Sequence, residues 1–140
     1  MTVGHHEAPG TTRAWNIALW FAQVLLAVAF GMAGLMKTTL PMAELMEKLP
    51  WTADVGQLTR FIGACELLGA LGMILPALTR IQPRLTALAG AGFTLLMILA
   101  AVFHLIRGEP QALLVNGTLG ALAAFVAWGR HVRAPIEPRT

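Results

Sequence analysis

The sequence has few of the residues on which soluble enzymes and disulfide-stabilised domains depend. Charged residues make up 12% of the 140 positions, against about 25% in an ordinary soluble domain. The single cysteine, Cys65, excludes both an internal disulfide and a paired-cysteine redox centre. No serine occurs in the chain, which excludes a serine nucleophile. Secreted disulfide scaffolds, dithiol oxidoreductases and serine hydrolases are therefore excluded.

Apolar residues are what the sequence has in excess. They make up 56% of the chain, and the mean hydropathy is +0.67. A fold of 15.0 kDa leaves about a third of its unfolded surface exposed, and an exposed surface of this composition would aggregate in water. We therefore expect a single domain embedded in a lipid bilayer. The net charge of +3 does not indicate a nucleic-acid partner, because the basic residues lie between apolar segments and form no stripe.

A helix that crosses a bilayer needs roughly 17–25 apolar residues. Four apolar runs in the sequence are long enough to cross a membrane. Backbone amides cannot stay unpaired in hydrocarbon, so each run should be an α-helix. Short polar turns containing Pro83 and Pro110 suit antiparallel neighbours. We expect an all-α fold, a four-transmembrane-helix antiparallel bundle. The expected segments are a polar N-terminal tail (1–14), a membrane domain (15–130) with helices at about 15–36, 58–78, 85–106 and 112–129, and a polar C-terminal tail (131–140).

The connection between the first two expected helices contains a short amphipathic pattern. Apolar residues recur at the i, i+3, i+4, i+7 spacing of one helix face, at Met42, Leu45, Met46 and Leu49. Pro41 suits the first turn of such a helix, and Trp51 suits an anchor at the membrane interface. We expect a short helix on the membrane surface. The alternative is an irregular loop in which the spacing arises by chance.

The placement of lysine and arginine predicts the orientation in the membrane. Six arginines lie in or next to the two tails and the second loop: Arg13, Arg80, Arg84, Arg130, Arg133 and Arg139. Only four basic residues, Lys37, Lys48, Arg60 and Arg107, lie in or next to the first and third loops, where four acids dilute them. Both termini should therefore be cytoplasmic, with the amphipathic segment outside. Ala27-Val28-Ala29 is similar to a signal-peptide cleavage site, but the apolar run continues to Met36, so we expect a retained helix.

Each expected helix keeps a polar group on a face rich in small residues, which should point towards the other helices. At about 1.5 Å per residue, Glu66 lies roughly 8 Å beyond Arg60, and His104 lies about 4–5 Å from the end of its helix. The outer half of the bundle should therefore hold a ligand-binding or proton-handling pocket formed by Lys37, Glu66, His104, Asn116 and Arg60. Gln23 alone lies towards the cytoplasmic half.

A carboxylate at the depth of Glu66 costs several kcal/mol unless it is protonated or paired. Lys37 can reach it, Arg60 can cap it and His104 can share its proton, which makes this group a candidate functional site. Structural alternatives stay open: a buried ion pair that only holds helix register, a hydrogen-bonded core histidine, and Asn116 as a polar contact between helices. No cluster has metal-ligand spacing, and a single intramembrane histidine cannot form a bis-histidine haem site.

Three segments resemble the DoxX-like family of small four-helix bacterial membrane proteins. They are GMAGLMK at 31–37, FIGACELLGALGMILP at 61–76 and FHLIRGE at 103–109. The resemblance covers nearly the whole chain between its tails and implies the four-helix fold and a bacterial cytoplasmic (inner) membrane. The family takes its name from a subunit of an archaeal membrane complex that passes electrons from reduced sulfur to quinone, and relatives are connected with membrane redox defence.

Together these observations predict an accessory or quinone-associated subunit of a membrane redox system. We expect no intrinsic cofactor, with quinone as the candidate ligand, and a membrane redox protein besides the lipid bilayer as partner. The alternatives are a non-catalytic binding or carrier protein for a lipid or small amphiphile, and a purely structural membrane subunit. At this point the sequence leaves open whether the chain forms a homo-oligomer and whether it catalyses a reaction.

Overall fold

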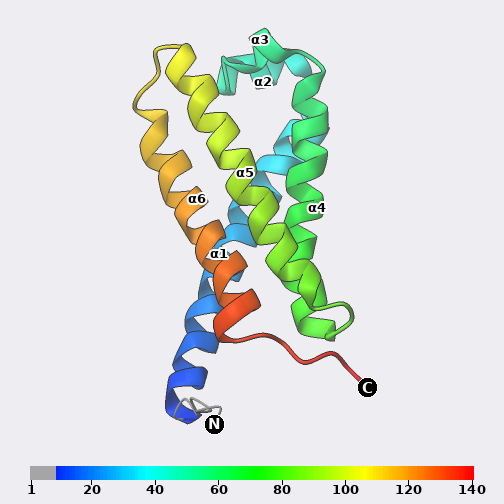
Figure 1. The fold of residues 1–140 in the computed structure, drawn as a ribbon. Helices are drawn as coiled ribbons and strands as arrows, with labels where there is room; N and C mark the ends of the chain where they lie inside the picture. The colour runs from blue at the N-terminus through cyan, green and yellow to red at the C-terminus, as the bar shows by residue number, and fades with distance from the viewer. Residues whose placement is uncertain (1–8) are drawn as a thin grey trace.

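The computed structural model describes residues 9–140, and this part of the chain is all-helical, with no strand. Its elements are α1 (Pro9–Thr39), α2 (Met42–Lys48), α3 (Thr52–Val55), α4 (Leu58–Thr79), α5 (Arg84–Ile106), α6 (Ala112–Trp128) and the π-helical turn η1 (Gly129–Arg133). We call the end covered by α2 and α3 the cap end, and the end where α1 begins and the chain finishes the terminal end (Figure 1). The expected four-helix fold is confirmed.

The four long helices are each long and apolar enough to cross a membrane. The candidate spans are Thr12–Thr39, Leu58–Thr79, Arg84–Ile106 and Ala112–Arg133. Their outer faces carry large apolar side chains, and Phe21, Ile106 and Leu114 are 73%, 81% and 78% exposed. Because such a surface suits acyl chains and not water, the chain is a multi-pass integral membrane protein.

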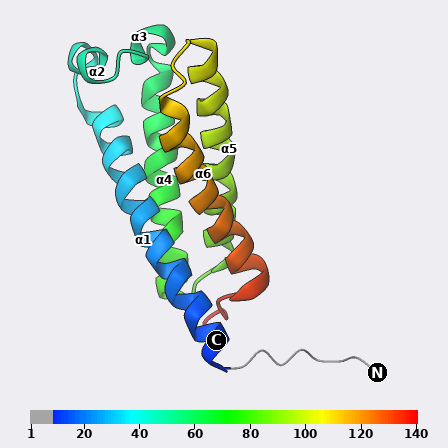
Figure 2. The same cartoon turned by 90° about the vertical axis from the view of Figure 1, so that its left-hand side faces the viewer.

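The helices pack as two close pairs, α1 against α4 and α5 against α6 (Figure 2). A Cβ at Gly63 of α4 would lie 2.7 Å from the Cβ of Lys37 in α1, and a Cβ at Gly90 of α5 would lie 2.9 Å from the carbonyl oxygen of Ala123 in α6. Glycine at these two positions therefore lets the helix backbones approach closely. Such packing drives association in lipid, where there is no hydrophobic force between helices.

The hydrophobic core joins the two pairs at mid-height. Phe30 of α1 stacks on Phe93 of α5, with ring centroids 3.8 Å apart and 12° between the ring planes. Leu26, Met73 and Val126 are fully buried in the same cluster, so each of the four long helices contributes to it. The core therefore holds the pairs together below the cap end.

Two helix boundaries differ from the expected ones. α1 begins at Pro9, inside the expected tail of residues 1–14, and proline suits the first turn of a helix. Residues 1–8 of that tail lie outside the described part of the chain. At the other terminus the last helix does not stop at 129 but continues through η1, because Arg130 is buried in the bundle and not in a polar tail.

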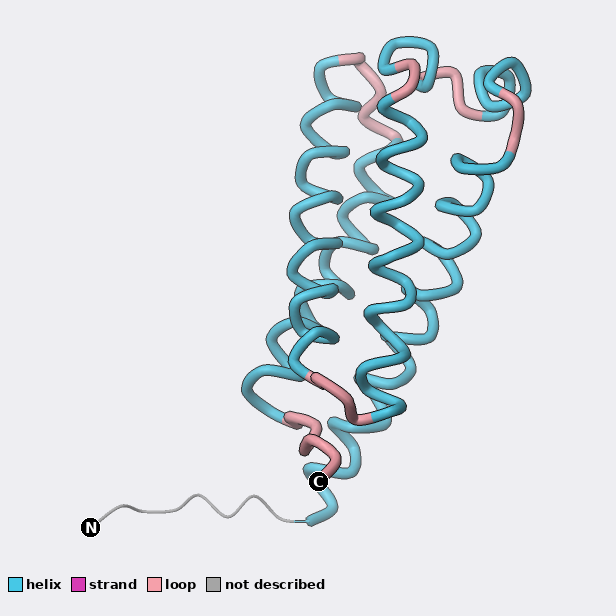
Figure 3. The backbone as a smooth tube through the Cα atoms, turned by 90° about the vertical axis from the view of Figure 1, so that its right-hand side faces the viewer, coloured by secondary structure: helices cyan, strands magenta, loops and turns pink. Residues whose placement is uncertain are grey.

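The amphipathic segment is helical, as its spacing predicts. It forms α2, in which Leu45 is fully buried while Glu47 and Lys48 are exposed. An irregular loop is therefore wrong for these residues. α3, which no apolar pattern predicts, follows directly, and the two short helices lie across the cap end (Figure 3).

Candidate functional site

A cavity of about 620 Å³ lies at the cap end. All four long helices line it, and the α2–α3 segment contributes Trp51 and the residues beside it. The lining is mainly apolar, with polar side chains at Lys37, Glu66, His104 and Asn116. The structure thus brings together around one cavity four of the five residues expected to form a pocket. Arg60, the fifth, is not among the lining residues.

Lys37 and Glu66 form a buried ion pair between α1 and α4. The Lys37 Nζ lies 2.5 Å from the Glu66 Oε1, and the two side chains are 9% and 4% exposed. Lys37 is in the last turn of α1, and the absence of a side chain at Gly63, one turn before Glu66, allows the approach. The Lys37 ammonium also lies 5.6 Å from the ring centroid of Trp51, which places a cation–π contact under the cap.

Arg60 contributes to the same region from outside the cavity. Its Nη1 donates to the carbonyl oxygen of Lys37 at 2.7 Å, so the expectation that Arg60 caps Glu66 is wrong. The carbonyls of the last helical turn have no partner within their own helix, and this guanidinium supplies one for α1. Arg60 therefore supports the backbone that carries Lys37.

His104 pairs with Glu109 and not with Glu66. The His104 Nδ1 donates to the Glu109 Oε2 at 2.6 Å, and the Glu109 Oε1 accepts from the Arg107 Nη2 at 3.0 Å. Arg107 also forms an ion pair with Asp54 of α3. The hydrogen bonds from Arg107 and then His104 hold the pKa of Glu109, in the α5–α6 loop, below its ordinary value. Together these residues connect the cavity wall with α3 and with the α5–α6 loop at the cap end.

The sequence contained a signal for this pair that residue depth alone does not reveal. Glu109 follows His104 by five residues across the turn that ends α5, and its backbone N–H donates to the His104 carbonyl oxygen at 2.9 Å. A helix-terminal histidine followed by a carboxylate within one turn is therefore the pattern that would have identified the partner of His104.

Two buried polar atoms of cavity-lining residues have no hydrogen-bond partner in the described part of the chain. They are the Glu66 Oε2, an acceptor, and the Asn116 Nδ2, a donor. The interpretation of Asn116 as a hydrogen-bonded contact between helices finds no support, because none of the described residues accepts from its Nδ2. Since most buried polar groups in native proteins are satisfied, an unpaired donor and an unpaired acceptor beside one cavity indicate a binding site.

A second polar network lies at the terminal end, around Gln23. The Arg130 Nε donates to the Gln23 Oε1 at 2.6 Å, the Arg130 Nη1 donates to the Asn16 Oδ1 at 2.6 Å, and the Gln23 Nε2 donates to the Met73 carbonyl oxygen at 2.6 Å. Arg130 is only 5% exposed. The Arg130 side chain points into the bundle, where its partner Gln23 comes from 107 positions earlier in the sequence.

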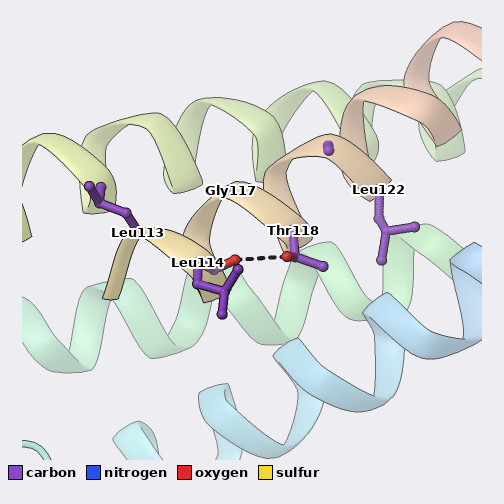
Figure 4. A pocket seen from close by; sticks show the side chains of 6 residues that line it. Leu113, Leu114, Gly117, Thr118 and Leu122 are labelled. Carbon is purple, nitrogen blue, oxygen red and sulfur yellow. Dashed lines mark hydrogen bonds between the residues drawn. The ribbon is translucent and has the colours of Figure 1, made fainter. Parts of the chain in front are cut away.

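A shallow hollow on the outer face of α6 is the other notable depression in the described surface. It is lined by Leu113, Leu114, Gly117, Thr118, Ala121 and Leu122 (Figure 4). Its one hydroxyl, Thr118 Oγ1, donates to the Leu114 carbonyl oxygen at 2.7 Å within the same helix. The hollow therefore offers a ligand only apolar contact, as a lipid-facing surface does.

The described residues contain no group of three or more histidine, cysteine, aspartate or glutamate side chains that could hold a metal ion. The chemistry that this cavity offers is hydrogen bonding to a polar head at Glu66 and Asn116, and proton transfer through His104 and Glu109.

Comparison with known proteins identifies one family. Residues 21–126 match the model of the DoxX-like family. No curated protein and no solved structure matches the chain. Since the match covers most of the chain, including Lys37, Glu66, His104 and Asn116, the protein belongs to the DoxX-like family.

Proposed function

We propose that this protein binds the polar head of a quinone or a similar small amphiphile in the cap-end cavity, as an accessory subunit of a membrane redox system. The observation that carries the proposal is the unpaired Glu66 Oε2 and Asn116 Nδ2 in a largely apolar cavity. A ligand with a hydroxyl group at one end and an apolar body, such as the reduced (quinol) form of a quinone, would pair both atoms and fill the volume.

The size and the walls of the cavity suit such a head group. Its volume of about 620 Å³ falls within the roughly 300–1,000 Å³ of small-molecule sites. Trp51 and Phe103 meet edge to face at a centroid distance of 6.1 Å, and both line the cavity. Aromatic walls of this kind favour a flat ring over a branched head.

The exposed part of the lining supports a route from the bilayer. Leu58 and Phe61 of α4 and Leu99 of α5 line the cavity and are also exposed on the outside of the bundle. In a membrane-spanning bundle this outside faces acyl chains. The ligand would therefore enter laterally between α4 and α5, beneath the segment from Pro41 to Leu49.

The His104–Glu109 pair supports proton exchange at the site. His104 lines the cavity, whereas Glu109 lies in the loop beyond the spanning segments. In this proposal a hydroxyl of the bound quinol transfers its proton to the His104 Nε2 and becomes the quinolate anion, while the carboxylate of Glu109, bonded to the Nδ1, stabilises the imidazolium. The pair would thereby connect the cavity to the aqueous boundary.

The proposal includes an orientation in a bacterial cytoplasmic membrane. Arg80 and Arg84 lie in and beside the loop at the terminal end, together with Arg130 and Arg133. The positive-inside rule places this end in the cytoplasm, so both termini would be cytoplasmic and the cavity would lie in the outer half of the bilayer.

Two alternatives each have an observation in their favour. The mainly apolar lining suits a lipid or amphiphile carrier with no redox partner. The bonds from Lys37 to Glu66 and from Arg60 to Lys37 join α1 to α4, which suits a purely structural subunit.

Purification in lipid nanodiscs, followed by mass spectrometry of the extracted small molecules, tests the proposal. We expect quinone, recovered in its quinol or its oxidised form, to co-purify with the wild type and to be lost from Glu66→Gln and His104→Ala variants that remain folded. Gln23→Leu is the matched control, because it removes a buried polar side chain at the terminal end and leaves the cavity intact. It should lose stability and keep the ligand.

The alternatives give different results in the same experiment. A lipid in place of quinone, with no redox enzyme recovered after crosslinking in native membranes, would favour the carrier. A wild type without any bound amphiphile, together with a Glu66→Gln variant that fails to fold, would favour the structural role.

A further inference from the structure

We infer that the cap-end cavity selects amphiphiles whose polar end carries a hydroxyl group, such as a quinol, over those whose oxygen atoms are only carbonyl or ether, such as the oxidised quinone. This inference rests on the proposed function, since it concerns the ligand of the same cavity. It follows from which hydrogen-bonding atoms around the cavity are already used and which are free.

Three of the polar side-chain atoms that line the cavity have a partner. The Glu66 Oε1 accepts from the Lys37 Nζ, and the His104 Nδ1 donates to Glu109. Two further atoms are buried without a partner in the described part of the chain: the Asn116 Nδ2, which can only donate, and the Glu66 Oε2, which can only accept. The hydrogen bond of His104 uses its Nδ1 and leaves the Nε2 for a ligand. To pair both buried atoms, the ligand must therefore accept a hydrogen bond from the Asn116 Nδ2 and donate one to the Glu66 Oε2.

The donor does not discriminate between ligand classes. A carbonyl, an ether and a hydroxyl oxygen can each accept from the Asn116 Nδ2, and the same holds for any further N–H of Lys37. All three ligand classes would therefore form the contact on this side of the cavity.

The acceptor does discriminate. In an ion pair with Lys37, the Glu66 carboxylate is an acceptor only, so its Oε2 needs an O–H or N–H from the ligand. A ligand with only carbonyl or ether oxygen leaves the Glu66 Oε2 buried and unpaired. The lone pairs of the ligand oxygen would also repel those of the carboxylate. A site built to bond a hydroxyl rejects the analogue that lacks it, because its own buried group is left without a partner.

Competing explanations of the unpaired oxygen have less support. Arg60 points its Nη1 at the Lys37 carbonyl oxygen, and His104 is engaged with Glu109, so neither of these neighbouring groups completes Glu66. The cavity wall itself is mainly apolar around the carboxylate. The ligand is therefore the remaining source of a donor for the Glu66 Oε2.

A matched pair of probes tests the inference directly. Para-decylphenol and its methyl ether have the same ring and the same alkyl chain, and the oxygen of each can accept a hydrogen bond. Only the phenol has an O–H that can donate one. We would measure the dissociation constant of each for the intact protein in nanodiscs by calorimetric titration. The phenol should bind about 10- to 100-fold more tightly than the ether, as expected when a buried acceptor is left unpaired.

Two variants locate the preference. Replacing the ion pair in Lys37→Met/Glu66→Met exchanges both charges for apolar side chains of similar length, and the ratio of the two dissociation constants should fall close to one. Asn116→Leu removes the donor that both probes use, so both should weaken while the ratio is kept. Gln23→Leu, at the terminal end, should change neither.

The outcomes separate this inference from the proposed function. Equal binding of phenol and ether to the wild type would overturn the hydroxyl preference and leave an amphiphile-binding cavity. Binding of neither probe would overturn both. A ratio retained in Lys37→Met/Glu66→Met would also overturn the inference, because the preference would then arise elsewhere.

Discussion

The two ends of the bundle differ in where their unpaired buried polar atoms lie. At the terminal end both amide atoms of Gln23 are bonded, to Arg130 and to the backbone of Met73, and the one unpaired atom of this network, the Arg130 Nη2, does not line the cavity. At the cap end Glu66 and Asn116 each keep one buried atom unpaired beside a cavity. Unpaired buried groups cost stability and tend to persist where function requires them. The contrast indicates that the terminal end anchors the bundle and the cap end binds.

The largest loss of stability should come from separating the ion pair at the cap end. Lys37→Met leaves a buried carboxylate without its partner, and the free energy of unfolding should fall by about 3–5 kcal/mol. Lys37→Met/Glu66→Met should recover most of this loss, because it removes both charges. Unfolding in mixed micelles measures the difference. A double variant as unstable as the single one would show that packing, and not the buried charge, causes the loss.

Breaking the terminal network should have the next largest effect. Arg130→Met removes the donor to Gln23 and the donor to Asn16, and the free energy of unfolding should fall by about 2–3 kcal/mol. Ligand binding at the cap end should be unchanged, because the two networks share no residue. Arg139→Met, in the exposed C-terminal segment, is the charge-matched control. Loss of ligand from Arg130→Met at temperatures where it stays folded would contradict the division into two ends.

A substitution at Asn116 should have the opposite sign. Asn116→Leu replaces a half-buried amide, whose Nδ2 is buried and unpaired, by an apolar side chain of similar size, so stability should be unchanged or rise by about 1 kcal/mol. The same variant should bind the ligand more weakly. Thermal unfolding and ligand titration on one sample measure both effects. A clear loss of stability would mean that Asn116 serves the fold and not the site.

The smallest effect should be a pH dependence at the cap end. Arg107 and His104 lower the pKa of Glu109 in the folded protein below its ordinary value of 4.5. A lowered folded pKa means that Glu109 stabilises the fold above pH 4.5 and that this contribution is lost as the pH falls below that value. The difference in unfolding temperature between wild type and Glu109→Gln should therefore shrink on acidification. A difference that does not shrink on acidification would show that the contribution of Glu109 does not depend on its charge.

Much of the fold could be predicted because lipid imposes strong constraints on a chain. Apolar runs of spanning length must be helices, and short turns with Pro83 and Pro110 make neighbours antiparallel. The small-residue faces of these runs correctly identified the buried positions of Gln23, Lys37 and Glu66. Helix ends were less predictable, because Pro9 and the residues of η1 carry no apolar signal.

The candidate site was predictable as a set of residues but not as a set of partners. Depth and helix face were sufficient to bring Lys37, Glu66, His104 and Asn116 to one region. The bonds of Arg60 to the Lys37 carbonyl oxygen and of His104 to Glu109 were not foreseen. Helical periodicity specifies the direction of a side chain, whereas hydrogen-bond partners depend on rotamers and on how two helices cross.

The amino-acid sequence by itself determined that this chain lies in a membrane, which segments cross it and which faces meet, because the exclusion of water leaves each apolar run one way to satisfy its backbone. Only the tertiary structure decided that the two helix pairs enclose a cavity beneath α2 and α3, and that Glu66 and Asn116 each leave a polar atom unpaired beside it. Pairing and free volume arise from distances of a few ångströms between segments far apart in the chain, and no local pattern encodes those distances.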